Sequence, residues 1–84
     1  MILAWADVAW SDYLYWQTTD KKILKRINLL LKATQRQPFS GVGEPEALKY
    51  QWTGYWSRRI TQEHRLVYKI DNDMLFVAQC RYHY

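Results

Sequence analysis

The chain has 84 residues, of which twelve are Lys or Arg and eight are Asp or Glu, so its formal charge is +4 with neutral histidines. This length accommodates one domain over residues 1–84 and leaves no room for a second. Hydrophobic residues make up 49% of the chain and charged residues 24%, which excludes intrinsic disorder because enough apolar surface is present to offset chain entropy. The single cysteine, Cys80, excludes an intramolecular disulfide framework and a cysteine-based zinc site.

Neither a membrane nor a secretory destination is indicated. No apolar run approaches the roughly 20 residues of a membrane-spanning helix, and the start MILAWAD lacks the basic residues of a signal peptide. We therefore expect a cytoplasmic protein without a membrane partner. The basic balance is compatible with an anionic partner but does not identify one.

The N-terminal part is predicted to form one strand and two helices. Residues 2–5 form a short apolar run typical of a strand, and Asp7 is a candidate N-cap for a helix over residues 8–18. Asp20 is a second candidate N-cap, because an apolar i, i+3, i+4, i+7 stripe runs through residues 20–36. The other face of this second helix is basic, since the segment holds six basic residues and one acidic residue.

The remaining part is predicted to be a loop followed by strands. Two prolines and two glycines between residues 38 and 45 predict the loop. Three later segments are rich in Val, Ile, Tyr and Phe and are predicted strands: 55–60, 65–70 and 74–82. The sequence Asp71-Asn72-Asp73 predicts a hairpin turn. The predicted fold is α+β in the order β-α-α-β-β-β, with two N-terminal helices packed on a mostly antiparallel four-stranded sheet.

Large aromatic side chains are expected to fill the core. Trp5, Trp10, Tyr13 and Trp16 belong to the predicted first strand and helix, and aromatic residues dominate the cores of small domains. Cys80 lies within a predicted strand and is expected to be a small buried hydrophobic residue.

Motifs of several enzyme classes are absent. The three glycines lack the spacing of a phosphate-binding loop, and no serine lies in a nucleophile elbow. Two histidines and one cysteine, without an HExxH motif, argue against a metal site. We therefore expect neither a metal nor another cofactor.

Polar residues with acid–base and phosphate-binding potential concentrate after residue 45. They are Glu46, Lys49, Arg58, Arg59, Glu63, His64, Arg65, Arg81, His83 and Tyr84. Cleavage of RNA by its own 2′-hydroxyl needs a base, a cation at the phosphate and an acid at the leaving oxygen. Carboxylates, arginines and histidines supply these groups. Exposed aromatic rings would stack on unpaired bases.

The same residues also have purely structural interpretations. Arginines on a strand commonly lie on a solvated face, and His64 beside Glu63 is typical of a turn or a surface pair. His83 lies near the end of the chain, where many chains fray. The residues alone therefore indicate a small α+β domain with RNA-binding potential and leave its catalytic role open.

Four segments together resemble the Txe/YoeB branch of the RelE-like messenger-RNA interferases: DYLYWQ (12–17), PFSGVGEPEALKY (38–50), GYWSRRITQEHRLVY (54–68) and CRYHY (80–84). The resemblance runs from the first predicted strand to the last residue without an insertion. It implies a microbial-RNase-like α+β fold and the toxin of a type II toxin–antitoxin pair. Such a toxin enters the ribosomal A site and cuts messenger RNA there by metal-free acid–base chemistry, which inhibits translation.

The resemblance also implies roles for individual residues. Glu46 corresponds to the general base for the 2′-hydroxyl, Arg65 to the phosphate-binding arginine, and His83 to the general acid. Tyr84 is expected to place or stack the substrate. The supporting residues are two basic side chains for RNA or phosphate and one acidic side chain further from the chemistry: Lys49, Arg59 and Glu63.

The role of Glu46 has two forms that the sequence leaves open. Lys49 is close in sequence, and the resemblance places Arg65 close in space. Opposite charges lower the pKa of a carboxylate and weaken it as a base. Glu46 is therefore either a true general base or a group that orients the 2′-hydroxyl.

The implied partners are a largely disordered antitoxin of the YefM type, a ribosome with messenger RNA in its A site, and a second copy of the chain in a homodimer. The main alternative is a non-catalytic basic module that binds RNA, a ribosome or a peptide. A DNA-binding regulator acting alone is a weaker alternative, because no recognition-helix motif is present.

Overall fold

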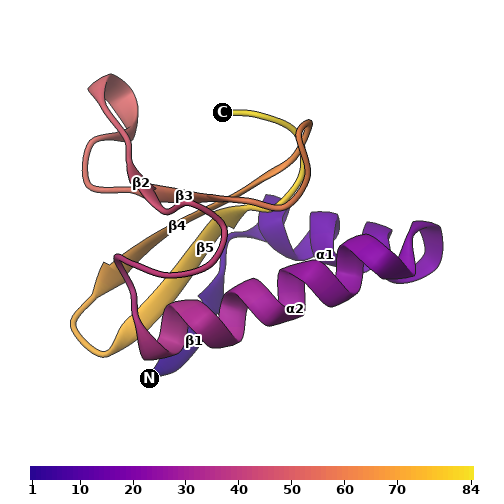
Figure 1. Ribbon diagram of the computed structural model, residues 1–84, viewed down its shortest axis with the longest axis horizontal. Coiled ribbons are helices and arrows are strands. Elements are labelled where there is room, and N and C mark those ends of the chain that lie inside the picture. Colours follow the sequence, from indigo (N-terminus) through magenta and orange to yellow (C-terminus); the bar gives the residue numbers. More distant parts are fainter.

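The computed structural model describes residues 1–84 as two helices packed against a five-stranded sheet (Figure 1). The elements in chain order are β1 (Ile2–Trp5), α1 (Asp7–Thr19), α2 (Lys21–Arg36), β2 (Glu46–Ala47), the 3₁₀ helix η1 (Tyr50–Trp52), β3 (Trp56–Arg59), β4 (Arg65–Asp71) and β5 (Met74–Gln79). The α+β class and the order of the two helices and four longer strands are as predicted. None of the helices combines the length and apolar character needed to cross a membrane.

The sheet has the order β1-β5-β4-β3-β2, in which only β1 and β5 run parallel. It is mostly antiparallel, as predicted, but it has five strands instead of four. The additional strand, β2, has two residues, Glu46 and Ala47, which pair with Ser57 and Trp56 of β3. Two residues are too few to show an alternating pattern, so this strand was not predicted from the sequence.

Helix α2 forms where its cap and periodicity predict it. The carboxylate of Asp20 accepts hydrogen bonds from the backbone N–H groups of Lys22 (3.0 Å) and Ile23 (3.2 Å). These bonds satisfy two donors that the first helical turn otherwise leaves free. The apolar stripe enters the core, where Ile27 and Leu30 are fully buried, and the basic face points to solvent.

Helix α1 differs from the prediction at its start. Asp7 is its first helical residue, and Ala6 occupies the N-cap position without a side-chain hydrogen bond. The prediction that Asp7 caps the helix is therefore wrong by one position. Its carboxylate acts on the helix only through its charge at the positive N-terminal end.

The aromatic residues around α1 are divided between core and surface. Trp16 is buried, whereas Trp10 is 46% exposed, so the expectation that Trp10 belongs to the core is wrong. Trp5 and Tyr13 are half-buried and pack against Trp10, with ring centroids 5.6 and 5.8 Å away. The rings of Trp10 and Tyr13 thus pack against β1, the edge strand of the sheet, to which Trp5 belongs.

Strand β5 ends at Gln79, earlier than the predicted residue 82. Side chains of α1 form hydrogen bonds with both backbone groups of Cys80. The carboxylate of Asp12 accepts from its N–H (3.1 Å), and the indole N–H of Trp16 donates to its carbonyl oxygen (2.9 Å). Cys80 is fully buried, as predicted, and burial raises the pKa of its thiol to about 12. These bonds fix the backbone at the end of β5, just before the last four residues.

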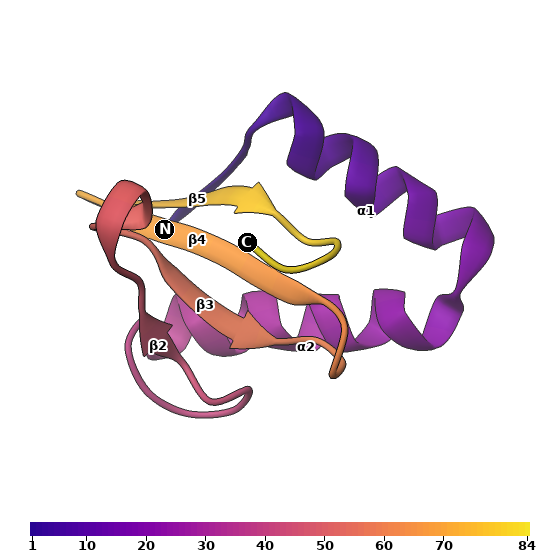
Figure 2. The ribbon, with the colours of Figure 1, turned by 90° about the horizontal axis from the view of Figure 1, so that it is seen from above.

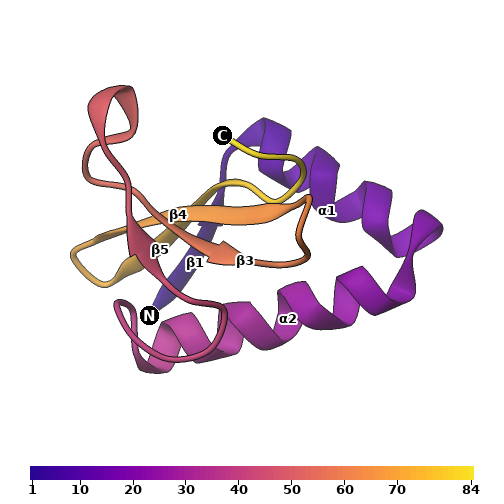
Figure 3. The same ribbon diagram turned by 45° about the horizontal axis from the view of Figure 1, so that its top comes forward.

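The two faces of the sheet are covered differently. The main core lies between the helices and the sheet and includes Leu66, Tyr68 and Leu75. A smaller cluster around Val67 lies on the other face. Figures 2 and 3 show β2, η1 and the C-terminus on the side away from α2, where no α-helix covers the sheet.

Candidate active site

Three segments that are distant in the sequence meet on the helix-free face of the sheet. Side chains from the loop and β2, from β3 and β4, and from the C-terminus line a cavity of about 130 Å³: Glu44, Glu46, Ser57, Arg59, Arg65, His83 and Tyr84. The strand register explains the grouping. Glu46 lies opposite Ser57, and Arg59 lies opposite Arg65, so these paired residues project from the same face.

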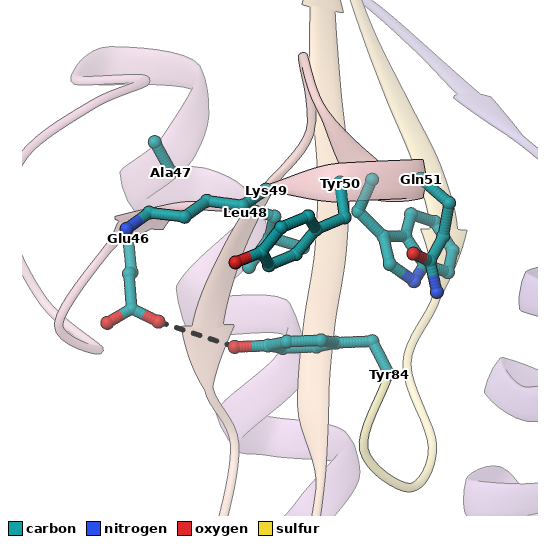
Figure 4. Close-up of a pocket in the computed structure, with 8 residues that line it drawn as sticks. Glu46, Ala47, Leu48, Lys49, Tyr50, Gln51 and Tyr84 are labelled. Atoms are coloured by element: carbon teal, nitrogen blue, oxygen red, sulfur yellow. Dashed lines mark hydrogen bonds between the residues drawn. The ribbon is translucent and has the colours of Figure 1, made fainter.

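A second cavity of about 430 Å³ adjoins the first and shares Glu46 and Tyr84 with it. Its remaining lining comes from residues 47–52. Figure 4 shows Lys49, Tyr50 and Tyr84 extending toward the side on which Glu46 lies. The Tyr50 side chain is 85% exposed, so an aromatic face is open to solvent beside the polar cavity.

Glu46 is exposed and has one side-chain partner. The hydroxyl of Tyr84 donates a hydrogen bond to its Oε1 at 3.3 Å (Figure 4). Neither Lys49 nor Arg65 takes part in any of the three ion pairs of the structure, and neither does Glu46 itself. The carboxylate is thus free to accept a proton or a hydrogen bond from an incoming hydroxyl.

Arg65 is held by one end of its guanidinium. Its Nη1 donates to the carbonyl oxygens of Thr61 (2.6 Å), Gln62 (3.0 Å) and His64 (3.1 Å). The other guanidinium nitrogen atoms donate to no acceptor in the protein. Because the guanidinium fork matches a phosphate, the free donors suit Arg65 to anion binding at the cavity.

The second cavity arginine, Arg59, pairs with Glu44 across 3.4 Å. Both side chains are largely exposed, so this ion pair is weak and open to exchange with a phosphate. Lys49 lines the larger cavity only. The predicted basic residues therefore surround Glu46 from both cavities.

His83 reaches the smaller cavity from the C-terminal segment. Its Nε2 lies 3.4 Å from the carbonyl oxygen of Gln62, which accepts a hydrogen bond when this ring nitrogen carries a proton. The carbonyl of His83 in turn accepts from the side-chain amide of Gln79 at 3.2 Å. Contacts on both the ring and the backbone thus place an imidazole at the same cavity as Glu46.

The C-terminal segment is docked and not frayed. The N–H of Tyr82 donates to Nδ1 of His64 at 2.7 Å, and the carbonyl of Tyr82 accepts from the N–H of Arg65 at 3.0 Å. The guanidinium of Arg81 lies 3.6 Å from the centre of the Tyr15 ring. These contacts carry the chain up to the cavity that His83 and Tyr84 line.

Glu63 does not line either cavity around Glu46. Its Oε1 lies 3.7 Å from Nε2 of His64, and both residues border a separate hollow with Arg81 and Tyr82. Glu63 is exposed, whereas His64 is only 7% exposed. Only one member of the surface pair expected from the sequence therefore lies on the surface.

Arg58 was not identified by the sequence as an organising residue. It is fully buried, and its guanidinium donates to the carbonyl oxygens of Val42 (2.9 Å), Ser40 (2.9 Å) and Gln37, and to the Tyr68 hydroxyl (3.2 Å). These bonds hold the loop that leads into β2 and Glu46. The alternation along β3 is the sequence signal for this role. Ser57 and Arg59 face the cavity, so Arg58 between them points to the opposite face, which the helices cover.

Gly43 brings the same loop close to α2. Its φ of +89° is unfavourable for other residues, and a Cβ atom there would lie 2.7 Å from Cδ2 of Leu30 and 3.1 Å from Cβ of Arg58. The carbonyl of Gly43 accepts from the N–H of Arg59 at 2.7 Å. The loop is therefore positioned by packing as well as by Arg58.

Comparisons with known proteins agree with this architecture. Residues 5–84 match the family model of the YoeB-like toxin of bacterial type II toxin–antitoxin systems. The chain is 60% identical to the toxin YoeB of Escherichia coli strain K12 over 84 residues, which cover 100% of both chains. It superposes on the YoeB/ParE toxin from Agrobacterium tumefaciens with a TM-score of 0.98, at 49% identity and 100% coverage of each chain.

A further solved relative is the toxin in the heterotetrameric YoeB-YefM toxin–antitoxin complex from Staphylococcus aureus. Its TM-score is 0.93 at 47% identity, and the match covers 100% of this chain and 98% of that one. A YoeB dimer from the same organism superposes equally well, with a TM-score of 0.93.

Proposed function

Because the chain belongs to the YoeB-like toxins of bacterial type II toxin–antitoxin systems, we propose that it is a ribosome-dependent endoribonuclease that cleaves messenger RNA in the A site and so inhibits translation. One observation carries the proposal. Glu46, Arg65 and His83, which come from three separate segments, line a single cavity. A carboxylate, a guanidinium and an imidazole are the groups that metal-free cleavage of RNA requires.

The proposed reaction is a transfer of the phosphodiester within the RNA strand. Glu46 accepts the proton of the 2′-hydroxyl, and the 2′-oxygen forms a bond to the neighbouring phosphorus. The bond from phosphorus to the 5′-oxygen breaks, and His83 gives its proton to that leaving oxygen. The products are a 2′,3′-cyclic phosphate and a free 5′-hydroxyl.

The basic residues stabilise the charge that develops on the phosphate. The free donors of Arg65 would bind the reacting phosphate directly, and Arg59 would exchange its exposed partner Glu44 for it. Lys49 would contact a neighbouring phosphate along the larger cavity. Tyr84, whose hydroxyl meets Glu46, would place or stack the substrate next to the base.

Two protein partners are proposed together with the activity. The Staphylococcus aureus relative is solved as a complex with YefM and as a dimer. We infer a YefM-like antitoxin for this chain, which folds as it binds and covers the site, and we infer a homodimer. The ribosome would hold the message in its A site.

Cleavage of a defined message on purified ribosomes tests the proposal. We expect Glu46→Ala, Arg65→Ala and His83→Gln each to reduce the cleavage rate by about tenfold or more, because each acid or base contributes about 10²–10⁴ in rate and the arginine stabilises the charge on the phosphate. The matched control is Asp71→Ala on the β4–β5 hairpin, outside both cavities. Full activity of His83→Gln would rule out the acid assignment, and a wild type that binds ribosomes without cutting would establish the binding-module alternative.

The variant Glu46→Gln separates the two roles of the carboxylate. Its amide oxygen can still accept a hydrogen bond from the 2′-hydroxyl, but it cannot take the proton. We expect a loss as large as that of Glu46→Ala if Glu46 is the general base. Retention of most activity would instead assign Glu46 to orienting the hydroxyl.

A further inference from the structure

The buried histidine His64 contacts the C-terminal segment one residue before the proposed general acid. Its Nδ1 accepts the backbone N–H of Tyr82 at 2.7 Å, and its ring meets the Trp16 ring edge to face, with centroids 4.8 Å apart. His64 is 7% exposed, so its ring is fixed in place by packing and its polar atom is satisfied by one specific donor. Nothing in the proposed reaction uses this residue.

Tyr82 adopts a backbone conformation that needs such an anchor. Its φ is +63°, a left-handed value that is unfavourable for a bulky side chain. Both of its backbone groups are held, the N–H by His64 and the carbonyl by the N–H of Arg65. The turn at Tyr82 redirects the chain, and the next two residues, His83 and Tyr84, line the cavity.

We propose that His64, through its neutral Nδ1, is the positioning residue that docks the C-terminal segment and so brings His83 and Tyr84 to the site. The catalytic consequence of this role rests on the proposed endoribonuclease function. The docking itself is a property of the folded chain and is independent of any substrate.

The hydrogen bond with Tyr82 defines the form of His64 that can serve. The N–H of Tyr82 is the donor, so Nδ1 must carry a lone pair, and the ring proton must lie on Nε2. That nitrogen lies 3.7 Å from Oε1 of Glu63, which favours this tautomer. In a doubly protonated ring, the N–H at Nδ1 would face the backbone N–H of Tyr82. The hydrogen bond that holds Tyr82 would then be lost.

Charged groups surround the ring on several elements. Glu63 precedes it in the same loop, and Asp12 and Asp20 lie at α1 and at its end. Arg81 lies in the C-terminal segment. Glu63 also gains a role from this arrangement, since it contacts the tautomer-setting nitrogen of His64 instead of the cavity around Glu46.

Two substitutions separate the acceptor atom from the ring. His64→Phe keeps a ring against Trp16 but removes the acceptor. His64→Asn removes the ring but places Oδ1 at the same number of bonds from the backbone as Nδ1, so the acceptor remains without a titrating group. If His64 only packs against Trp16, His64→Asn is the more damaging change because it removes the ring. If His64 positions Tyr82, His64→Phe is the more damaging change because it removes the acceptor.

Amide hydrogen exchange on ¹⁵N-labelled protein, without RNA, measures the docking. In His64→Phe we expect the Tyr82 amide to exchange about tenfold faster or more, while the core amides of Leu66 and Val77 keep their rates. On ribosomes, the same variant should lose about tenfold or more in cleavage rate at unchanged ribosome affinity. His64→Asn should stay within about threefold of wild type in both measurements.

A measurement on the wild type guards against variants that fail to fold. A long-range ¹H–¹⁵N spectrum reports which ring nitrogen of His64 carries the proton, and we expect Nε2–H. An Nδ1–H tautomer, a protected Tyr82 amide in His64→Phe, or equal losses in both variants would overturn the proposal. If the wild type cuts no RNA, the proposed function fails, and the exchange and tautomer data still decide the docking.

Discussion

Neighbouring residues of the same type have opposite environments in this protein. Arg58 and Arg59 follow one another on β3, yet Arg58 is fully buried and Arg59 is largely exposed. Successive side chains on a strand point to opposite faces, so the helix-covered face receives one arginine and the open face the other. The buried guanidinium has no carboxylate partner. Backbone carbonyl oxygens and the Tyr68 hydroxyl compensate its charge, which makes it the centre of the loop before β2.

Replacing Arg58 is expected to destabilise the fold strongly. Arg58→Met would leave three carbonyl oxygens and the Tyr68 hydroxyl without their donor, and we expect a loss of about 3 kcal/mol or more in the free energy of unfolding. Urea denaturation followed by tryptophan fluorescence measures this loss. Arg59→Met is the matched control and should change stability by about 1 kcal/mol or less, because its only ion pair is exposed. Equal losses for the two variants would contradict the assigned role of Arg58.

At the scale of elements, local signals determine one helix better than the other. Asp7 is the first residue of α1, and Asp20 directly precedes α2. Only Asp20 is placed to accept hydrogen bonds from the free N–H groups of the first turn. Helix α2 also has a continuous apolar stripe that enters the core, including Ile27 and Leu30. Helix α1 has only Ala9 and Trp16 buried, and Trp10 and Tyr13 pack against Trp5 of the edge strand β1. Sequence periodicity therefore defined α2 closely and predicted the packing of α1 less well.

The two aspartates are expected to differ in their contribution to stability. Asp20→Ala removes two hydrogen bonds to the first turn of α2 and should lower the free energy of unfolding by about 1 kcal/mol. In a chain of this size that corresponds to roughly 4–8 °C in melting temperature. Asp7→Ala removes only a charge near the N-terminal end of α1 and should cost about half as much or less. Calorimetry of both variants, with Asp20→Asn as the cap-preserving control, tests this order.

At the scale of the whole molecule, the candidate site combines the C-terminal segment with the middle of the chain, and α1 holds the start of that segment. Asp12 and Trp16 of α1 hold the backbone of Cys80, and His64 holds Tyr82, so the last residues are fixed from two elements. Burial raises the pKa of Asp12, and the hydrogen bond from Cys80 offsets part of this shift. The docked segment contributes His83 and Tyr84 to the cavity that contains Glu46.

Removing residues 83–84 is expected to separate activity from folding. The deletion leaves the anchors at Cys80 and Tyr82 in place, so we expect a change of about 4 °C or less in melting temperature. Cleavage on ribosomes should fall by about tenfold or more, because the proposed acid is lost. A six-residue extension at the N-terminus, which lies on the other side of the molecule in Figure 1, serves as the control and should retain activity. An active deletion variant would place the chemistry elsewhere.

Family resemblance supplied the candidate residues, and the structure shows which of them share a cavity. Glu46, Arg59, Arg65, His83 and Tyr84 meet, whereas Lys49 lines the adjoining cavity and Glu63 lies beside His64. Their catalytic roles stay predictions for the cleavage assay. The anchoring by His64 has no signature in the sequence, because its donor is a backbone group eighteen residues away.

Features that depend on a few consecutive residues could be predicted from the chain itself. They include the cap at Asp20, the stripe of α2, the loop with its glycines and the turn at Asn72, since each results from hydrogen bonding or backbone preference within one or two turns. Tertiary structure decided which face of the sheet the helices cover. That choice buried Arg58, and the packing of α1 beside β1 left Trp10 exposed, because burial depends on contacts between distant segments.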